Sequence, residues 1–357
     1  MATKIHKLLL TTTLALVVLF TTSKAFANDP AASTEAAFNP GEMIQHHITD
    51  APDWHIVTID GHEYSIPLPV ILYSSQRGLD VFSSSRFEHG HAAYNGYKLE
   101  HGHIEAVDAS GSADHSVYLY NVSITKNVAS MMLSAVILLV LFLTIAGSYK
   151  KRQGLAPKGA QSFFEPIILY IRDDVAKTMI GPKYEKFMPY LLTIFFFIWF
   201  NNLLGLIPAG ANVSGNITFT LFLALATFIV TTLTANKYYW AHILWTPGVP
   251  LPLRIIILPL EVIGMFTKPF SLMIRLFANI TAGHIIVLSF LGLVFIFKTI
   301  AVAAFGVPFA LFISILELFV ALLQAYVFTL LTALYFGSAV HAHEHDDDHA
   351  QGHEAAH

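Results

Sequence analysis

The sequence predicts an all-α polytopic membrane protein with about five membrane crossings. Hydrophobic residues make up 55% of the 357 residues and charged residues only 12%, whereas an ordinary soluble domain carries about 25% charged residues. Several apolar stretches are long enough to cross a hydrocarbon core of about 30 Å. The last two are much longer and predict long tilted helices, and a small periplasmic N-terminal region of uncertain fold precedes the first.

Charge and residue content exclude several functions. The net charge is −4 and the acidic residues gather outside the apolar stretches, so no nucleic-acid partner is expected and membrane lipid is. The chain has no cysteine, which excludes disulfides and thiolate catalysis. It also lacks a "GxxxxGK[ST]" phosphate-binding loop. We therefore expect no bound nucleotide and no cofactor.

Residues 1–27 have the layout of a secretory signal peptide. "MATKIHK" supplies a positive region, "LLLTTTLALVVLF" an apolar core, and "AFA" a small-residue cleavage site that ends at Ala27. This order of features directs export and cleavage. An uncleaved N-terminal anchor is the alternative, and either one places Asn28 onward outside the cytoplasm.

Residues 28–127 are polar and rich in histidine and glycine, and we expect a small periplasmic region. "HEYSIPLPVILYSS" and "HSVYLYNVSITKN" alternate apolar and polar residues, a pattern that predicts short strands. The histidines could bind Zn²⁺, but they lack the spacing of a defined site, so solvated surface is the preferred interpretation and no metal site is predicted. These histidines are His46, His47, His55, His62, His89, His91, His101, His103 and His115.

The first predicted membrane span covers residues 128–146. It is followed at once by "YKKRQG", and positive residues beside a span mark its cytoplasmic end. This agrees with an exported N-terminus. Five crossings then leave the C-terminus in the cytoplasm, in a multi-pass protein of the bacterial inner membrane.

Residues 153–187 contain an amphipathic stretch that we expect to lie in the cytoplasmic membrane interface. Charged residues occupy the other face of the helical wheel. The apolar residues at helical spacing are Phe163, Ile167, Ile168, Ile171, Val175 and Met179.

Two further spans, 188–208 and 217–235, form a predicted hairpin. It returns the chain to "NKYYWAH", whose aromatic residues suit an interfacial belt. Asn201 and Asn202 are polar groups deep in the first of these spans. Hydrogen bonds between helices explain them more simply than a direct role in transport.

The last two spans are predicted at 253–297 and 304–340, which completes a membrane domain over 128–340. Each is longer than the roughly 20 residues that a bilayer needs, so each must tilt, kink or lie partly in the membrane plane. "KTIAVAAFGVP" at 298–308 is expected to divide them, and Pro269 and Gly283 are possible bends. Residues 341–357 form a His- and Asp-rich cytoplasmic tail that is predicted to be disordered.

Polar residues form a stripe along each of the last two spans. Arg254, Glu261, Lys268 and Arg275 are seven residues apart, which places them on nearly one face of a continuous helix. Asn279 follows Arg275 by one turn. The second stripe consists of Ser314, Glu317, Ala321 and Gln324.

Ionisable groups inside a membrane usually line an ion path or pair with another charge. Arg275 stays protonated at any physiological pH, so it is a fixed cation. His284 and Glu317 can titrate near operating pH if their surroundings shift them. A fixed cation with two titratable groups is suited to moving protons. The alternative is a buried ion pair of Arg275 with Glu261 or Glu317.

Two motifs carry a family resemblance. "PFSLMIRLFANITAGH" and "VPFALFISILELFVALLQAYVFTLLTALYF" resemble the C-terminal half of subunit a of the F-type ATP synthase membrane sector. The resemblance is detailed over about the last 150 residues, and the layout of spans extends it back to Val128. The long N-terminal region is similar to that of longer members in some bacteria.

The resemblance implies roles for individual residues. Arg275 matches the essential arginine that faces the ring of c subunits, and Asn279 matches the asparagine one turn beyond. Gln324 matches the glutamine that faces the arginine from the last helix, and Glu261 a carboxylate of the cytoplasmic exit path. Many members carry glutamate at position 284 and histidine on the last helix. Here His284 and Glu317 exchange these identities, which implies that the two side chains meet and share one task in periplasmic access.

The resemblance also implies a mechanism and partners. A proton enters through one half-channel, neutralises a carboxylate on the c-subunit ring, and leaves through a second half-channel after the ring has turned. The chain would be a non-catalytic subunit that assembles with the c ring, the subunit b stalk and, through the complex, the F1 sector. Protons are the default ion, with Na⁺ left open. Two rival hypotheses are a self-contained proton-coupled transporter and a periplasmic metal-binding membrane protein.

Overall fold

The computed structural model describes residues 41, 44–45, 48–59, 62–90, 92–100, 102–108, 111–114, 116–207, 210–245 and 250–340. The predicted signal peptide (1–27) and the predicted tail (341–357) lie outside the described residues. Several histidines of the N-terminal region are also outside them, namely His46, His47, His91, His101 and His115.

A β-rich region precedes the helices and contains three small antiparallel sheets, with strand orders β1-β2, β4-β3-β7 and β5-β6. Strand β3 alternates, as its sequence predicts: Val70 and Leu72 are buried, whereas Ile71 and Tyr73 point to the other face. The buried side chains form a small core around Phe87. The strands are β1 Asp53–Ile59, β2 His62–Pro67, β3 Pro69–Ser74, β4 Gly78–Ser83, β5 Tyr97–Glu100, β6 His103–Ala106 and β7 Leu119–Asn121, and a 3₁₀ segment η1 covers Ser84–Gly90.

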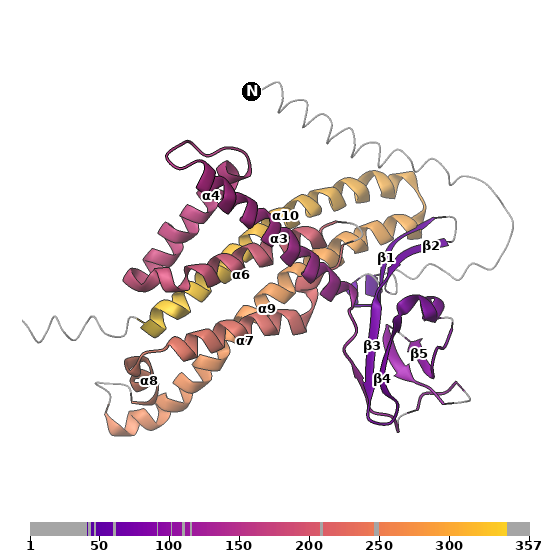
Figure 1. The fold of residues 1–357 in the computed structure, drawn as a ribbon, viewed down its shortest axis with the longest axis horizontal. Helices are drawn as coiled ribbons and strands as arrows, with labels where there is room; N and C mark the ends of the chain where they lie inside the picture. The colour runs from indigo at the N-terminus through magenta and orange to yellow at the C-terminus, as the bar shows by residue number, and fades with distance from the viewer. Residues whose placement is uncertain are drawn as a thin grey trace, which may run out of the picture. The chain divides into compact units, whose positions relative to one another are not determined.

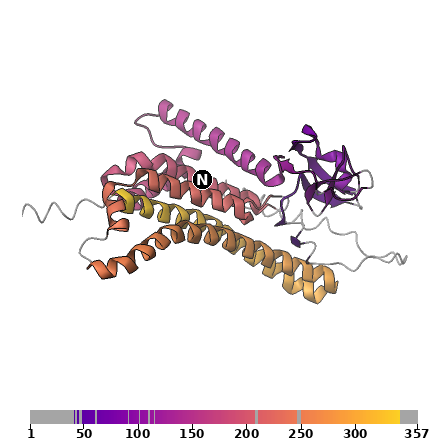
Figure 2. The same cartoon turned by 90° about the horizontal axis from the view of Figure 1, so that it is seen from below.

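The rest of the described chain is helical and contains five stretches long and apolar enough to cross a membrane, which confirms the predicted fold class. Figures 1 and 2 show the last two helices, α9 and α10, side by side along much of their length. The helices are α3 Lys126–Lys151, α4 Ala160–Tyr170, α5 Thr178–Ile180, α6 Tyr184–Gly205, α7 Ile217–Thr234, α8 Lys237–Leu244, α9 Leu251–Phe297 and α10 Ile300–Val340, with shorter segments η2 Ile171–Lys177, η3 Gly181–Lys183 and η4 Val213–Gly215.

Close packing of small residues and aromatic rings holds helix α10 against its neighbours. The rings of Phe187 on α6 and Phe336 on α10 lie 4.8 Å apart between centroids. Next to Phe336, Gly337 approaches the backbone carbonyl of Met179 so closely that a Cβ atom would have no room. Small residues permit such approaches between membrane helices, whose association depends on packing because lipid is itself apolar.

The amphipathic stretch before α6 is built into the helix bundle. It runs as α4, the π-helical segment η2 and the short segments α5 and η3, and continues into α6. Ile171 and Val175 are fully buried in the bundle core, whereas Phe163 remains exposed. One part of the predicted apolar stripe is therefore buried in the bundle and another part is exposed, because the π-helical segment changes the helical periodicity. Its place in the membrane interface stays a prediction.

The boundary between the last two helices differs from the predicted divider at 298–308. Helix α9 ends at Phe297, Lys298 adopts a left-handed conformation (φ 47°), and α10 begins at Ile300. Gly306 and Pro308 are helical despite their usual effect on helices. A Cβ atom at Gly306 would lie 3.1 Å from Val294 Cγ2, so the glycine permits close contact with α9. The prediction of a long divider was wrong because packing overrides local propensity here.

Candidate functional site

The predicted polar residues Glu261, Arg275 and His284 all lie on helix α9, which is continuous from Leu251 to Phe297. A rise of 1.5 Å per residue places Glu261 about 21 Å from Arg275 along the axis. On the other side, His284 lies about 14 Å from Arg275 by the same rise. The two titratable groups thus lie roughly one hydrocarbon thickness apart, with the fixed cation between them.

His284 and Glu317 meet across α9 and α10. Nδ1 of His284 lies 3.3 Å from Oε1 of Glu317, and the two side chains are only 13% and 5% exposed. Gly283 makes this contact possible, because a Cβ atom at that position would lie 3.1 Å from the same carboxylate oxygen. The two side chains therefore meet, as the family resemblance implies. Their low exposure strengthens any electrostatic interaction between them.

Arg275 forms no ion pair with Glu261 or Glu317, nor a hydrogen bond, within the described part of the chain. The ion-pair alternative therefore has no support in this structure. Gln324 is buried on α10, but its Oε1 accepts a 2.8 Å hydrogen bond from Nδ2 of Asn279. Its own Nε2 has no hydrogen-bond partner. The glutamine thus contacts the residue one turn beyond the arginine. That it faces Arg275 itself, as the family resemblance implies, stays a prediction.

Asn201 and Asn202 bind neighbouring helices, as the simpler interpretation predicts. Nδ2 of Asn201 donates to Ser134 Oγ on α3, at 2.9 Å. Asn202 accepts a 2.5 Å hydrogen bond from Ser214 Oγ and donates to the Ala321 carbonyl of α10, at 3.3 Å. Ala321 is one turn from Glu317, so Asn202 links the short loop segment η4 to the polar stripe of α10.

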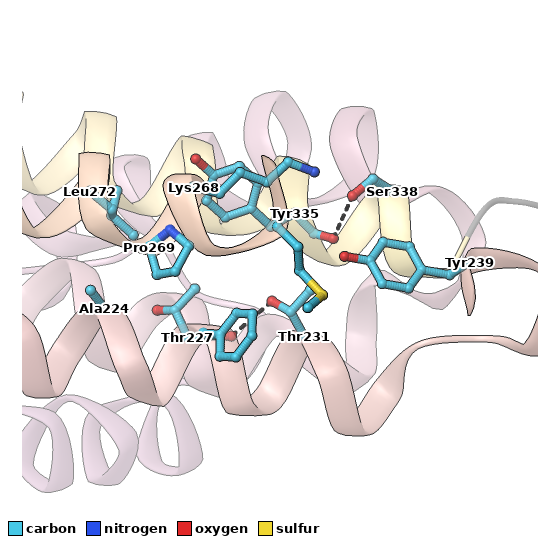
Figure 3. Close-up of a pocket in the computed structure, with 11 residues that line it drawn as sticks. Ala224, Thr227, Thr231, Tyr239, Lys268, Pro269, Leu272, Tyr335 and Ser338 are labelled. Carbon is cyan, nitrogen blue, oxygen red and sulfur yellow. Dashed lines mark hydrogen bonds between the residues drawn. The ribbon is translucent and has the colours of Figure 1, made fainter. Parts of the chain in front are cut away.

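A cavity with several polar side chains in its lining lies around Glu261, at the other end of the α9 stripe. It has a volume of about 290 Å³ and is lined by residues of α8, α9 and α10. Figure 3 shows the adjoining pocket, which extends from Tyr239 and Ser338 past Lys268 to Leu272. Leu272 is less than one turn before Arg275. The lining of the larger cavity is Tyr239, His242, Ile243, Glu261, Met265, Lys268 and Ser338.

Tyr239, which lines this cavity, belongs to helix α8 and so lies outside the five long apolar helices. Burial raises the pKa of the Tyr239 hydroxyl, and the negative charge of Glu261 raises it further. Tyr239 therefore remains neutral and can donate a hydrogen bond at any physiological pH.

Among the described residues, no group of three or more His, Asp or Glu side chains could hold a metal ion.

Sequence reasoning missed several residues of this site. His242 and Tyr239 appear in the sequence only as part of an interfacial aromatic belt, and Gly283 only as a possible bend. The motif "AGH" does contain a signal for Gly283, since a helical glycine beside a titratable residue often permits close approach. No local pattern places His242 and Glu261 at one cavity, because that depends on the packing of α8 against α9.

The fold defines a polytopic membrane protein whose long apolar helices carry several polar and ionisable side chains. The family described as ATP synthase A chain matches residues 128–337. The chain is 49% identical over 244 residues to ATP synthase subunit a of Chloroherpeton thalassium, covering 67% of this chain and 72% of the relative. It is 51% identical over 242 residues to ATP synthase subunit a 2 of Chlorobaculum tepidum, covering 66% and 67%. The chain belongs to the ATP synthase A chain family.

A longer match includes the N-terminal region. The chain is 37% identical over 335 residues to ATP synthase subunit a of an Anaeromyxobacter species, covering 90% of this chain and 77% of the relative. Residues 43–125 match a domain of unknown function (DUF8433). The predicted family and role are thereby confirmed: a non-catalytic, proton-translocating subunit of the F-type ATP synthase, assembled with other subunits as a multi-pass membrane protein.

Proposed function

We propose that the chain provides two half-channels to a c-subunit ring, with Arg275 as the fixed charge between them. One observation carries this proposal. A single helix, α9, presents Arg275 between two separate polar regions, the buried pair at His284 and the cavity at Glu261. A path that is interrupted at a permanent cation prevents protons from crossing directly, since the guanidinium does not release its proton.

The access half-channel runs past His284, Glu317 and the Asn202 group. These side chains come from α9, α10 and α6, and each is buried or nearly so. Because the histidine and the carboxylate share a short contact, either one can hold a proton taken up from water. His284 then becomes a cation that the Glu317 carboxylate stabilises, or Glu317 becomes a neutral carboxyl group beside a neutral imidazole. A proton then passes from this pair to a carboxylate on the ring.

At Arg275, the positive charge favours the ionised form of a ring carboxylate. Once protonated, that carboxyl group is neutral and can rotate into lipid without the cost of burying a charge. After nearly a full turn it loses its proton to the exit half-channel, lined by Lys268, Glu261 and His242. Each proton that moves down 100 mV releases about 2.3 kcal/mol, so several protons are needed for each ATP.

The proposed orientation places the N-terminal region in the periplasm and residues after Val340 in the cytoplasm of an inner membrane. It is supported by Lys150, Lys151 and Arg152 at the end of α3, because basic residues collect on the cytoplasmic side. The proposed direct partners are the c-subunit ring, against the exposed side of α9 and α10, and the subunit b stalk.

ATP-driven acidification of inverted membrane vesicles tests the role of Arg275. We compare the wild type with Arg275→Ala at matched protein levels, using Arg254→Ala as the control. Arg254 is a cation on the same helix, and it stacks over the Trp245 ring at 4.4 Å. We expect Arg275→Ala to abolish acidification while ATPase subunits stay attached, and Arg254→Ala to retain it.

Normal acidification by Arg275→Ala would show that the arginine is structural and would refute the proposal. The rival self-contained transporter predicts proton movement by the purified chain alone, without a ring. The rival metal-binding protein predicts loss of function on replacing His89, His91, His101 and His103 and tolerance at Arg275. Repeating the assay with and without Na⁺ identifies the coupled ion.

A further inference from the structure

The three-stranded sheet of the β-rich region has one buried face and one exposed face. Val70 and Leu72 of β3 contribute to the small core, whereas Ile71 and Tyr73 point outward. Strand pairing extends the outward residues into two rows across the sheet. These rows are Leu79–Tyr73–Tyr120 and Val81–Ile71–Val122.

The exposed face carries no charge and is mostly apolar. Leu79, Val81, Tyr120 and Val122 are each more than 60% exposed. The rings of Tyr73 and Tyr120 lie 6.4 Å apart between centroids, and they form the only aromatic pair across these two rows. Soluble proteins seldom expose contiguous patches of this kind unless something binds them. We call these six residues the outer sheet face.

The sheet is joined to the first long apolar helix by a very short connection. The pairing of β3 with the chain after β7 continues to Ile124, whose N–H donates to the Pro69 carbonyl at 3.1 Å. Helix α3 begins two residues later at Lys126. The sheet therefore ends where the helix starts, with one residue, Thr125, between them.

Two more hydrogen bonds fix this junction. The N–H of Lys126 donates to the Ala51 carbonyl at 2.9 Å, and the N–H of Asn127 donates to Oδ1 of Asp50 at 3.1 Å. Both acceptors belong to the chain just before β1. The first turn of α3 is thus held by the β-rich region, which leaves no flexible linker to carry the sheet away from the membrane surface.

The chain keeps the outer sheet face close to the start of α3. Val122 is four residues before Lys126, so it lies at most about 13 Å from that residue. The polar headgroup zone on each side of the hydrocarbon core is about 5–8 Å deep, so the face reaches this zone where the sheet lies along the membrane surface. Tyrosine is enriched in this zone because its ring is apolar and its hydroxyl is polar.

From this continuity we propose that the outer sheet face lies on the bilayer surface that α3 enters, in contact with lipid headgroups and the first methylene groups. Lipid fits the face better than a charged protein partner, because the two rows offer no ionic group. The β-rich region then acts as a membrane-bound platform that fixes the start of α3.

Spin-label accessibility tests this proposal in the assembled complex, reconstituted in nanodiscs of phosphatidylethanolamine and phosphatidylglycerol. The chain has no cysteine, so each single substitution gives it one labelling position, and the complex with the wild-type chain shows any label on other subunits. Tyr120→Cys and Val81→Cys report the outer sheet face from two strands. Glu105→Cys, on the exposed side of the separate β5-β6 hairpin, is the control.

We expect labels at positions 120 and 81 to collide several-fold more with oxygen, which dissolves in lipid, and several-fold less with a water-soluble nickel chelate than the label at position 105. Equal accessibility at all three positions would place the face in water and overturn the proposal. Protection of 120 and 81 from both reagents would show that protein covers the face, and would overturn it as well. Because each variant replaces an exposed side chain, retained ATP-driven proton pumping by the complex checks that the variant chain has assembled.

Discussion

Replacing Gly283 with alanine tests whether the close approach of α9 and α10 sets proton access. An added Cβ atom would lie 3.1 Å from Oε1 and 3.2 Å from Cδ of Glu317, whereas ordinary contact begins at 3.4 Å. The carboxylate must therefore retreat by a few tenths of an ångström. The contact with His284, already 3.3 Å, then lengthens to about 3.6 Å, at which a hydrogen bond is lost.

The energetic consequence has two parts of opposite sign. Alanine favours a helix over glycine by about 0.8–1.0 kcal/mol. A hydrogen bond to a charged group contributes about 1.5–3 kcal/mol, and each 1.4 kcal/mol is about tenfold in an equilibrium. Stability of the fold should therefore change little, while the population of the paired state that receives protons falls about tenfold or more.

The assay is passive proton flow through vesicles from which the ATPase sector has been stripped, followed with a pH-sensitive dye. We expect the initial rate for Gly283→Ala to fall about tenfold, as the paired state does. Gly264→Ala is a matched control, since that glycine lies on the same helix and a Cβ atom there would meet nothing within 4 Å. Equal flow through the two variants would refute the reasoning that the distance between His284 and Glu317 controls access.

Two other predictions concern stability. Gly337→Ala should destabilise the bundle by about 1–3 kcal/mol, because the Cβ atom would overlap the Met179 carbonyl. Thermal unfolding in detergent measures this loss, with Gly147→Ala as the control, since a Cβ atom at Gly147 would meet nothing within 4 Å. Equal unfolding temperatures for the two variants would contradict the prediction. Burial, and the 2.7 Å hydrogen bond to Asp80, raise the pKa of the Tyr97 hydroxyl. The neutral hydroxyl therefore stabilises the fold fully below the unfolded pKa of about 10. This stabilisation is lost as pH rises through the higher pKa of the folded state. Protease resistance of the β-rich region in the full chain should therefore fall between pH 9 and 12 less steeply in Tyr97→Phe than in the wild type, and equal slopes would rule out Tyr97 as the cause.

Much of the helical architecture follows from composition and periodicity. Apolar length alone locates five long helices, because a bilayer demands about 20 apolar residues for each crossing. The seven-residue spacing from Glu261 to Arg275 places those side chains on one helix, since helical periodicity is a local property. Both depend on neighbours in the sequence and can be recognised without knowledge of the tertiary fold.

Features that depend on packing could not be predicted in the same way. The residues around Pro308 resemble a helix break, but contact between Gly306 and α9 keeps them helical. The approach of His284 to Glu317 was expected only through the family resemblance, because 33 residues separate them. The hydrogen bond that Gln324 accepts from Asn279 was not predicted, since it joins residues 45 positions apart on two helices. In each case the rotation of one helix against another decides the contact.

Helix α9 keeps Glu261, Arg275 and His284 on one unbroken backbone, and this restricts how the gene can change. Inserting or deleting one residue between Glu261 and His284 would rotate everything beyond it by about 100° and shift it by 1.5 Å. A change between Glu261 and Arg275 would move the cation off the face that it shares with Glu261. A change between Arg275 and His284 would turn His284 relative to the cation and disturb its contact with Glu317, although every side chain was still present. Natural variants should therefore tolerate many substitutions in this segment but almost no change in its length.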